Sequence, residues 1–335
     1  MLTGTALLPG QGMGNRLFCY VSVRSLSLDA GEDFFLKGAE LMPDFLSSAP
    51  EGVMAPDPSG EPAEYREREE RIYIGDSVHD MVHGCYVAGK DPDIRRAREV
   101  SGAGDRPVLI SGNLQDESYF SAHRQEVREW LKVSPDRDNM TLARDNVCLL
   151  NVRCGEYVQE NALFLKRSYW QRAMEHMRKV RSDMEFHIVT DDTREASKLL
   201  PGIPVHHGEV SDDYSMLKNA HYLILSNSSF GFFPAYTSEN LRYAIAPMHW
   251  ARYNTSDGFW SSEQNIYSIF TYMDRQGGLH TPEECRELLE SYKAGRQAVR
   301  KTPYDDGCAA VRFRAFRDRV SYLGRRAIRK YIIVS

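Results

Sequence analysis

The residues best suited to chemistry follow apolar runs of the chain. Arg153 and Glu156 come directly after the apolar run 147–152. An arginine presents its donors in a planar fork that matches the oxygens of a diphosphate. This pair therefore indicates either a site for a phosphorylated ligand or an internal ion pair that only fixes the loop.

Two more polar clusters end apolar runs in the same way. Asp191 and Asp192 can bind a nucleotide hydroxyl or base, hold a metal, or cap the helix expected from Thr193. The segment Ser226-Asn-Ser-Ser229, followed by Phe230, is rich in hydroxyls and amides. Such a turn can cradle a phosphate through hydroxyl and backbone N–H groups, although an ordinary serine or asparagine turn has the same composition.

A glycine-rich segment near the N-terminus, Gly10-Gln-Gly-Met-Gly-Asn15, is a weaker signal. It lacks the Lys-Ser/Thr of a P-loop and the third glycine of the G-x-G-x-x-G dinucleotide fingerprint. Its small residues would let the backbone approach a ligand and direct helix N–H groups at an anion. A tight structural turn explains the same residues.

The elements that must position these clusters alternate between strand and helix. We expect a strand at 5–8 and a helix at 17–28, and then strands at 147–152, 186–190, from 205 and at 222–226, with helices at 169–181, 193–200 and 214–220. This alternation predicts an α/β protein with a parallel, doubly wound sheet, which binds ligands beyond the carboxyl ends of its strands. We predict domains at 1–145 and 146–270 and a helical tail at 271–335.

Length and composition restrict the class of protein. A chain of 335 residues fits about two domains at roughly 150 residues each. The net charge of −5 argues against a protein that grips nucleic acid over its whole surface. We find no run of the ~20 apolar residues that span a bilayer and no basic segment typical of a signal peptide. We therefore expect a cytoplasmic enzyme.

Metal and redox chemistry are not predicted. The six cysteines never form C-x-x-C, which disfavours a zinc ribbon or a redox pair. The two D-x-D triplets, Asp91-Pro-Asp93 and Asp136-Arg-Asp138, lie in polar stretches and follow no apolar strand. We expect neither triplet to hold a metal, and we expect no cofactor.

Taken together and in order, six segments resemble glycosyltransferase family 11, the α-1,2-fucosyltransferases. They are the loop 10–20, which resembles G-G-L-G-N-Q-x-F-Q-Y; 112–120, which resembles G-Y-x-Q-x-x-x-Y-F; 151–157, which resembles H-x-R-R-G-D-Y; 190–192; 213–233, which ends like A-N-S-S-F-S-W-W; and Ile245-Ala-Pro247. The resemblance covers roughly residues 8–250.

The resemblance implies two Rossmann-like domains facing a cleft, the B-type glycosyltransferase fold, with a metal-independent reaction. It places Arg153 on the donor diphosphate. It implies a GDP-sugar site in the C-terminal half, with the N-terminal loop over the donor. The substrate-binding residues that we predict are Gly12, Gly14, Asn15, Asn151, Asp191, Asp192, Asp213, Asn227, Ser228, Ser229 and Phe230.

Several positions depart from the family pattern. Asn151 replaces the signature histidine, Cys154 the second arginine and Glu156 the aspartate, and Phe232-Phe233 replaces a tryptophan pair. These changes leave open which sugar the donor carries and which residue is the general base. Glu156 is the candidate base. The changes also leave open a weakly active or non-catalytic relative.

The function expected is inverting transfer of L-fucose from GDP-fucose to a hydroxyl of a glycan acceptor, the 2-OH of a galactose. The alternatives are a transferase of another GDP-deoxysugar, a nucleotide-sugar-binding protein without catalysis, and a nicotinamide-dependent dehydrogenase. The last is disfavoured because no acidic residue ends a second strand ~20 residues after the glycine-rich loop.

The C-terminal residues 310–335 combine an apolar stripe at helical spacing with eight Arg and Lys residues and one Asp. A basic amphipathic helix can lie on an anionic membrane, where an enzyme could meet a lipid-linked glycan. A helix that packs its stripe on the body of the protein is the favoured alternative. We therefore expect a cytoplasmic protein and keep a peripheral membrane contact through residues 310–335 as the alternative.

Overall fold

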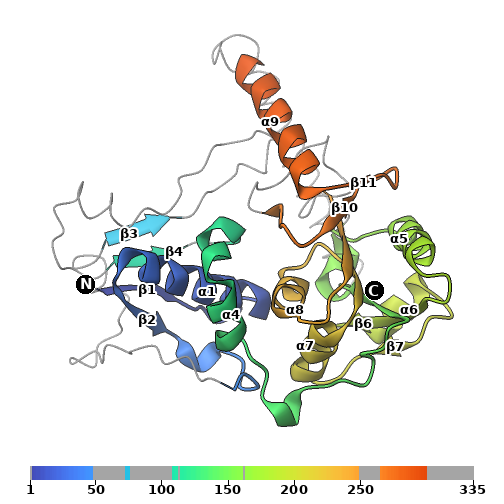
Figure 1. The fold of residues 1–335 in the computed structure, drawn as a ribbon, viewed down its shortest axis with the longest axis horizontal. Helices are drawn as coiled ribbons and strands as arrows, with labels where there is room; N and C mark the ends of the chain where they lie inside the picture. The colour runs from blue at the N-terminus through green and yellow to red at the C-terminus, as the bar shows by residue number, and fades with distance from the viewer. Residues whose placement is uncertain are drawn as a thin grey trace, which may run out of the picture.

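A computed structural model of the chain describes residues 2–47, 72–75, 108–111, 114–160, 163–248 and 265–299. These residues form two sheets that lie on opposite sides of the molecule, with helices between and around them (Figure 1). The α/β class is confirmed. The basic segment 310–335, Asp91, Asp93 and the start of the predicted element 112–120 lie outside the described residues.

The first sheet is built from the N-terminal part of the chain. Its four strands are parallel and lie in the order β2 (Asp33–Lys37), β1 (Leu2–Ala6), β4 (Val108–Ser111) and β3 (Ile72–Gly75). The long helix α1 (Met13–Ala30) packs on β1 and β2. The predicted strand at 5–8 is therefore shifted, because β1 begins three residues earlier and ends at Ala6.

The second sheet has seven strands in the order β11 (Leu279–His280), β10 (Thr271–Met273), β9 (Tyr243–Pro247), β8 (Tyr222–Leu225), β5 (Val147–Val152), β6 (Glu185–Thr190) and β7 (Val205–His206). All neighbours are parallel except β10 and β11. From β5 the chain winds outward through β6 and β7, then returns to β8 on the other side of β5. Such a reversal between β5 and β8 is where doubly wound sheets bind ligands.

The apolar run of β5 explains the layers of this second domain. All six residues of β5 are buried, since both of its faces are covered. Cys148, Leu150 and Val152 pack with α5 (Arg167–Val180) and α6 (Thr193–Leu199). Val147 and Leu149 belong to the core on the opposite face, with α7 (Val210–Asn219) and α8 (Phe232–Thr237).

The predicted helical tail does not begin at residue 271. Residues 271–273 and 279–280 form β10 and β11, and helix α9 (Pro282–Val299) starts only after them. Burial explains the difference, because Tyr272 and Met273 are inaccessible to solvent and extend the sheet beside β9. The domain boundaries themselves stay a prediction.

An aromatic cluster joins the two halves. The ring of Phe18, in α1, lies 4.8 Å from that of Phe232 and 4.7 Å from that of Phe233, both in α8. Tyr267 lies 4.2 Å from Phe232, and Phe120 contacts the same group. These rings are almost fully buried, so the halves share one apolar core.

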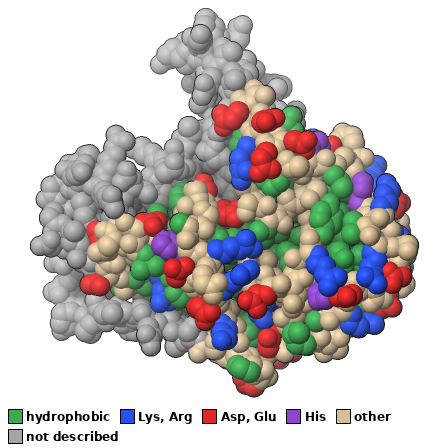
Figure 2. Space-filling model, in the orientation of Figure 1, with side chains coloured by type: hydrophobic (Ala, Val, Ile, Leu, Met, Phe, Trp, Pro, Cys, Tyr) green, Lys and Arg blue, Asp and Glu red, His purple; other side chains and the backbone are tan. Residues whose placement is uncertain are grey.

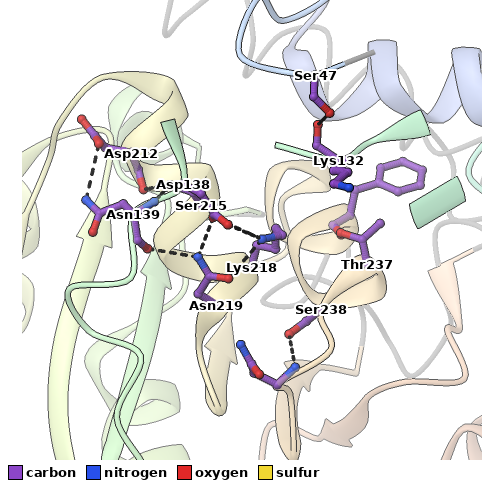
Figure 3. Close-up of polar contacts among 12 residues, drawn as sticks. Ser47, Lys132, Asp138, Asn139, Asp212, Ser215, Lys218, Asn219, Thr237 and Ser238 are labelled. Carbon is purple, nitrogen blue, oxygen red and sulfur yellow. Dashed lines mark hydrogen bonds and ion pairs between the residues drawn. The ribbon is translucent and has the colours of Figure 1, made fainter. Parts of the chain in front are cut away.

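The connection between the halves is fixed by polar contacts to α7. After α4 (Arg124–Trp130) the chain passes below both sheets and enters β5 (Figure 1). On the way Asp138 accepts hydrogen bonds from Lys218 at 3.1 Å and from Asn219 at 2.7 Å (Figure 3). Asn139 donates to Asp212 at 3.4 Å and to the Ser215 hydroxyl at 3.0 Å. Asp138 therefore has a structural role.

The described surface mixes charges of both signs. Acidic and basic side chains alternate over the second sheet and its helices on the face shown in Figure 2. Within the described ranges, none of the helices combines the length and the apolar content that crossing a membrane requires.

Candidate active site between the two sheets

A cavity of about 880 Å³ lies between the two halves. One wall is formed by residues at the carboxyl ends of β5, β6 and β8, together with the start of α7. The other wall comes from the start of α1 and the segment 40–45. The described lining residues are Met13, Arg16, Glu40, Leu41, Met42, Pro43, Asp44, Phe45, Arg137, Asn151, Val152, Arg153, Val189, Thr190, Asp191, His207, Glu209, Val210, Ser211, Asp213, Ser228 and Phe230.

Arg153 is held at the end of β5 by two carboxylates. Its Nη1 lies 2.7 Å from Asp191 Oδ2, and its Nη2 lies 3.3 Å from Glu156 Oε1. Its guanidinium carbon lies 5.6 Å from the centre of the Tyr157 ring. About a third of the side chain is exposed. The ion pairs therefore orient the guanidinium and leave part of it accessible from the cavity.

The two aspartates after β6 have different partners. Asp191 lines the cavity, pairs with Arg153 and accepts the N–H of Cys154 at 2.8 Å. Asp192 instead caps α6, since its carboxylate accepts the N–H of Glu195 at 3.0 Å. The capping interpretation is thus confirmed for Asp192, and its assignment to the substrate is not supported by this geometry.

Asp213 is a buried carboxylate on the cavity wall, in the first turn of α7. It accepts the N–H of Gly208 at 3.1 Å and lies 3.3 Å from His207 Nδ1. Burial raises the pKa of Asp213 above its ordinary value, although both of these hydrogen bonds oppose the shift. His207 is about half exposed and also lines the cavity, so the two form a polar pair open to a ligand.

The turn after β8 brings only part of the Ser-Asn-Ser-Ser cluster to the cavity. Ser228 and Phe230 line it, and the Ser228 hydroxyl accepts the N–H of Phe230 at 3.4 Å. Asn227 turns away, because its amide donates to the carbonyl of Leu163 at 3.0 Å. Asn151, at the end of β5, lines the cavity and lies 3.5 Å from the Ser226 hydroxyl.

The glycine-rich loop serves the contact between the two halves. A Cβ atom on Gly14 would come within 2.4 Å of the Ser229 backbone, so only glycine permits this approach. Asn15 accepts a hydrogen bond from Gln115 at 2.9 Å, and Gln115 accepts one from Asn265 at 2.8 Å. Gly12 caps α1 without close neighbours. These three residues do not line the cavity.

The predicted residues therefore fall into two groups. Six line the cavity: Asn151, Arg153, Asp191, Asp213, Ser228 and Phe230. The others lie beside it: Gly12, Gly14, Asn15, Glu156, Asp192, Asn227 and Ser229. Glu156 is three-quarters exposed and reaches Arg153.

Sequence reasoning missed most of the N-terminal wall. Arg16 lies in the recognised loop 10–20 but was not among the predicted binding residues, and the segment 40–45 matches no motif, so only the fold brings them to the cavity. His207 and Glu209 were also missed, although they lie in the loop after β7, where a doubly wound sheet places ligand contacts.

Among the residues that the structure describes, no three His, Cys, Asp or Glu side chains are grouped as a metal site. Asp136 is exposed, and Asp138 is paired with Lys218. The metal independence of the reaction stays a prediction.

Solved structures with a related arrangement share little sequence with this chain. A variant of Arabidopsis thaliana FUT1 in complex with GDP is 11% identical over 73% of this chain and 69% of that one, with a TM-score of 0.41. Fucosyltransferase NodZ from Bradyrhizobium is 12% identical over 70% and 91%, with a TM-score of 0.37. E. coli heptosyltransferase WaaC with ADP is 11% identical over 87% and 99%, with a TM-score of 0.39. These values are too low to carry a function to this chain.

No curated protein matches the chain in sequence. The model of glycosyl transferase family 11 does match, over residues 62–271. The matched part is more than half of the chain and includes β5, β6, α7 and the turn after β8. The matched part begins after the glycine-rich loop 10–20, so the resemblance of this loop to the family pattern is a separate observation. The chain belongs to glycosyl transferase family 11.

Proposed function

We propose that the protein is an inverting fucosyltransferase that moves L-fucose from GDP-fucose to the 2-OH of a galactose in a glycan acceptor. Membership of the family supports sugar transfer. The observation that carries the proposal is the place of Arg153, which lies at the reversal of a doubly wound sheet and lines a cavity of about 880 Å³.

The leaving group sets the main electrostatic demand. Breaking the bond between fucose and the diphosphate leaves growing negative charge on the diphosphate oxygens. Donors fixed in advance stabilise such charge without reorganising. Arg153, held by Asp191 at 2.7 Å, supplies the charged donors, and the Ser228 hydroxyl supplies a neutral one.

The nucleoside part of the donor would meet the start of α7. The Asp213 carboxylate has acceptor capacity beyond the N–H of Gly208 and the His207 ring. It can accept from a ribose hydroxyl or a base N–H. Phe230 offers a half-buried aromatic face on the same wall.

Inversion requires a base that takes the proton of the acceptor hydroxyl. Glu156 does not line the cavity and is bonded to Arg153, so we assign it the task of orienting that arginine. Glu40 and Asp44 are exposed carboxylates on the opposite wall and are better placed as bases. Comparison of Glu40→Gln, Asp44→Asn and Glu156→Gln in single-turnover assays separates these roles.

The reaction is proposed to need no metal, because an arginine takes the place of a divalent cation at the diphosphate. Activity measured in excess EDTA should equal untreated activity. Loss of activity that manganese restores would contradict this part of the mechanism.

The decisive experiment is incubation with GDP-fucose and lactose, followed by a panel of other nucleotide sugars. Fucosylated lactose is the expected product, with the new bond at the 2-OH. Turnover with another GDP-deoxysugar, and none with GDP-fucose, would show that the donor is that other sugar nucleotide. Binding without turnover would favour a nucleotide-sugar-binding relative, for which the buried Cys154 in place of an arginine is the specific observation.

We propose a cytoplasmic enzyme in which residues 310–335 either pack on the body of the protein, the favoured alternative, or make a peripheral membrane contact near a lipid-linked acceptor. Co-sedimentation with anionic vesicles at low and high salt, with and without these residues, tests the contact. An intact chain that ignores vesicles at low salt would rule it out.

A further inference from the structure

The described wall of the cavity carries more negative than positive side chains. Its carboxylates are Glu40, Asp44, Asp191, Glu209 and Asp213, whereas its cations are Arg16, Arg137 and Arg153, with His207 beside them. A diphosphate brings further negative charge into this surrounding. The cations that remain available therefore decide whether such a ligand can bind.

Two of the three arginines already have carboxylate partners. Arg153 pairs with Asp191 at 2.7 Å and with Glu156 at 3.3 Å. Arg137 lies 3.9 Å from Asp136, with about half of its side chain in solvent. Both keep donors for a ligand, but much of their charge is balanced within the protein.

Arg16 differs from both. It lies one turn into α1, and its Nη1 donates to the backbone carbonyl of Leu41. Its Nε is buried and has no acceptor among the residues that the structure describes. No described carboxylate lies within ion-pair distance of it. A buried donor without a partner is costly, and an anionic ligand in the cavity would remove that cost.

We propose that Arg16 binds the diphosphate of the donor from the N-terminal wall, opposite Arg153. This inference rests on the proposed function, because it takes the diphosphate-linked donor as the ligand. Arg16 brings a charge that no described carboxylate balances to a cavity rich in carboxylates. The diphosphate then bridges a helix of the first sheet and a strand end of the second.

The contact to Leu41 gives this bridge a further effect. The carbonyl of Leu41 belongs to the segment that also carries Glu40 and Asp44 into the cavity. A ligand that fixes Arg16 therefore also fixes the wall that holds the proposed bases. Arg16 is in this respect a positioning residue for the acceptor side.

The test measures binding of GDP and of guanosine by calorimetry, at low and high salt. Arg16→Gln removes the charge and shortens the side chain, so it also loses the contact from Nη1 to Leu41. We expect its GDP affinity to fall roughly 10- to 100-fold, the range for hydrogen bonds to charged groups. Guanosine binding should stay unchanged, and the salt dependence of GDP binding should become shallower.

Arg24→Gln is the matched control, since Arg24 lies two turns further along α1 and stacks 4.4 Å from the Trp130 ring, away from the cavity. It should bind GDP like the wild type. Arg16→Lys keeps the charge and should retain the salt dependence with a smaller loss of affinity, so it serves if the Gln variant folds poorly.

The outcomes are separable. Unchanged GDP affinity in Arg16→Gln, or an equal loss for guanosine, overturns the role of Arg16 and leaves the proposed function standing. A wild-type protein that binds neither GDP nor GDP-fucose overturns the proposed function and this inference together.

Discussion

The two halves of the molecule form the cavity in different ways. In the C-terminal half, Arg153 and Asp191 follow directly after β5 and β6, Ser228 lies in the turn after β8, and hydrogen bonds or ion pairs fix all three. In the N-terminal half, Arg16 projects from α1, and Glu40 and Asp44 are exposed side chains on the segment after β2. The wall at the strand ends, where we propose that the donor binds, thus faces a wall built from the start of α1 and the segment 40–45. Rigid strand ends suit charge stabilisation, whereas loops allow acceptors to vary.

The largest effect should follow a change on the rigid wall. Arg153→Lys removes the forked donors and keeps the charge, so the activity should fall roughly 100-fold or more. Arg144→Lys is the matched control, because Arg144 pairs with Glu185 on the outside of the sheet, 2.9 Å away. A near-normal kcat/KM of the Arg153→Lys variant would contradict the proposal that Arg153 binds the donor diphosphate.

The next effect concerns the contact between the walls. Gly14→Ala places a methyl group within 2.4 Å of the Ser229 backbone, and overpacking of this kind costs about 1–3 kcal/mol of unfolding free energy. Activity should fall as well, because the cavity widens. Gly12→Ala meets no atom within 4 Å and should behave like the wild type in denaturant unfolding. Equal stability of the two variants would refute the close approach.

A smaller effect is expected at the neutral donor. Ser228→Ala removes one hydroxyl from the cavity and should raise the KM for GDP-fucose roughly 3- to 10-fold. Ser229→Ala removes the neighbouring hydroxyl, which does not line the cavity, and should leave KM unchanged. The opposite ranking in steady-state kinetics would move the phosphate contact to Ser229.

The smallest effect is a pH dependence at Asp213. Burial raises the pKa of this carboxyl above 3.8, so the protonated form is more favoured in the folded state than in the unfolded state. Its stabilising contribution is present below pH 3.8 and is lost as the pH rises through the folded pKa. Relative to Asp213→Asn, the wild type should therefore lose thermal stability from pH 4 to pH 7. A constant difference in Tm between the two proteins across this range would contradict the raised pKa.

The same contrast explains what the sequence could predict. Strand β8 is an apolar run, β5 is apolar except for Asn151, and β6 contains Phe186, Ile188 and Val189, so the sequence predicted their bounds and the polar residues after them. The sequence also predicted that Asp192 caps α6, because an aspartate directly before an expected helix is a local signal. These features depend on local sequence, which a single chain displays directly.

The other half depends on contacts between distant residues. Arg16 meets Leu41 only after α1 and β2 have packed, and no spacing in the sequence encodes that approach. The strand β10 was missed because it is three residues long and follows a segment without strong periodicity. The early start of α7 was missed because Glu209, at its N-cap, makes no side-chain capping bond.

The aromatic cluster between the halves has a consequence for synthesis. A chain leaves the ribosome from its N-terminus, so Phe18 and Phe120 emerge long before Phe232 and Phe233 can cover them. Until then two rings that end almost fully buried face water or any apolar surface nearby. The newly synthesised N-terminal half therefore exposes an apolar surface that favours aggregation. We expect a chaperone to cover this surface until the C-terminal half has been synthesised and packs on it.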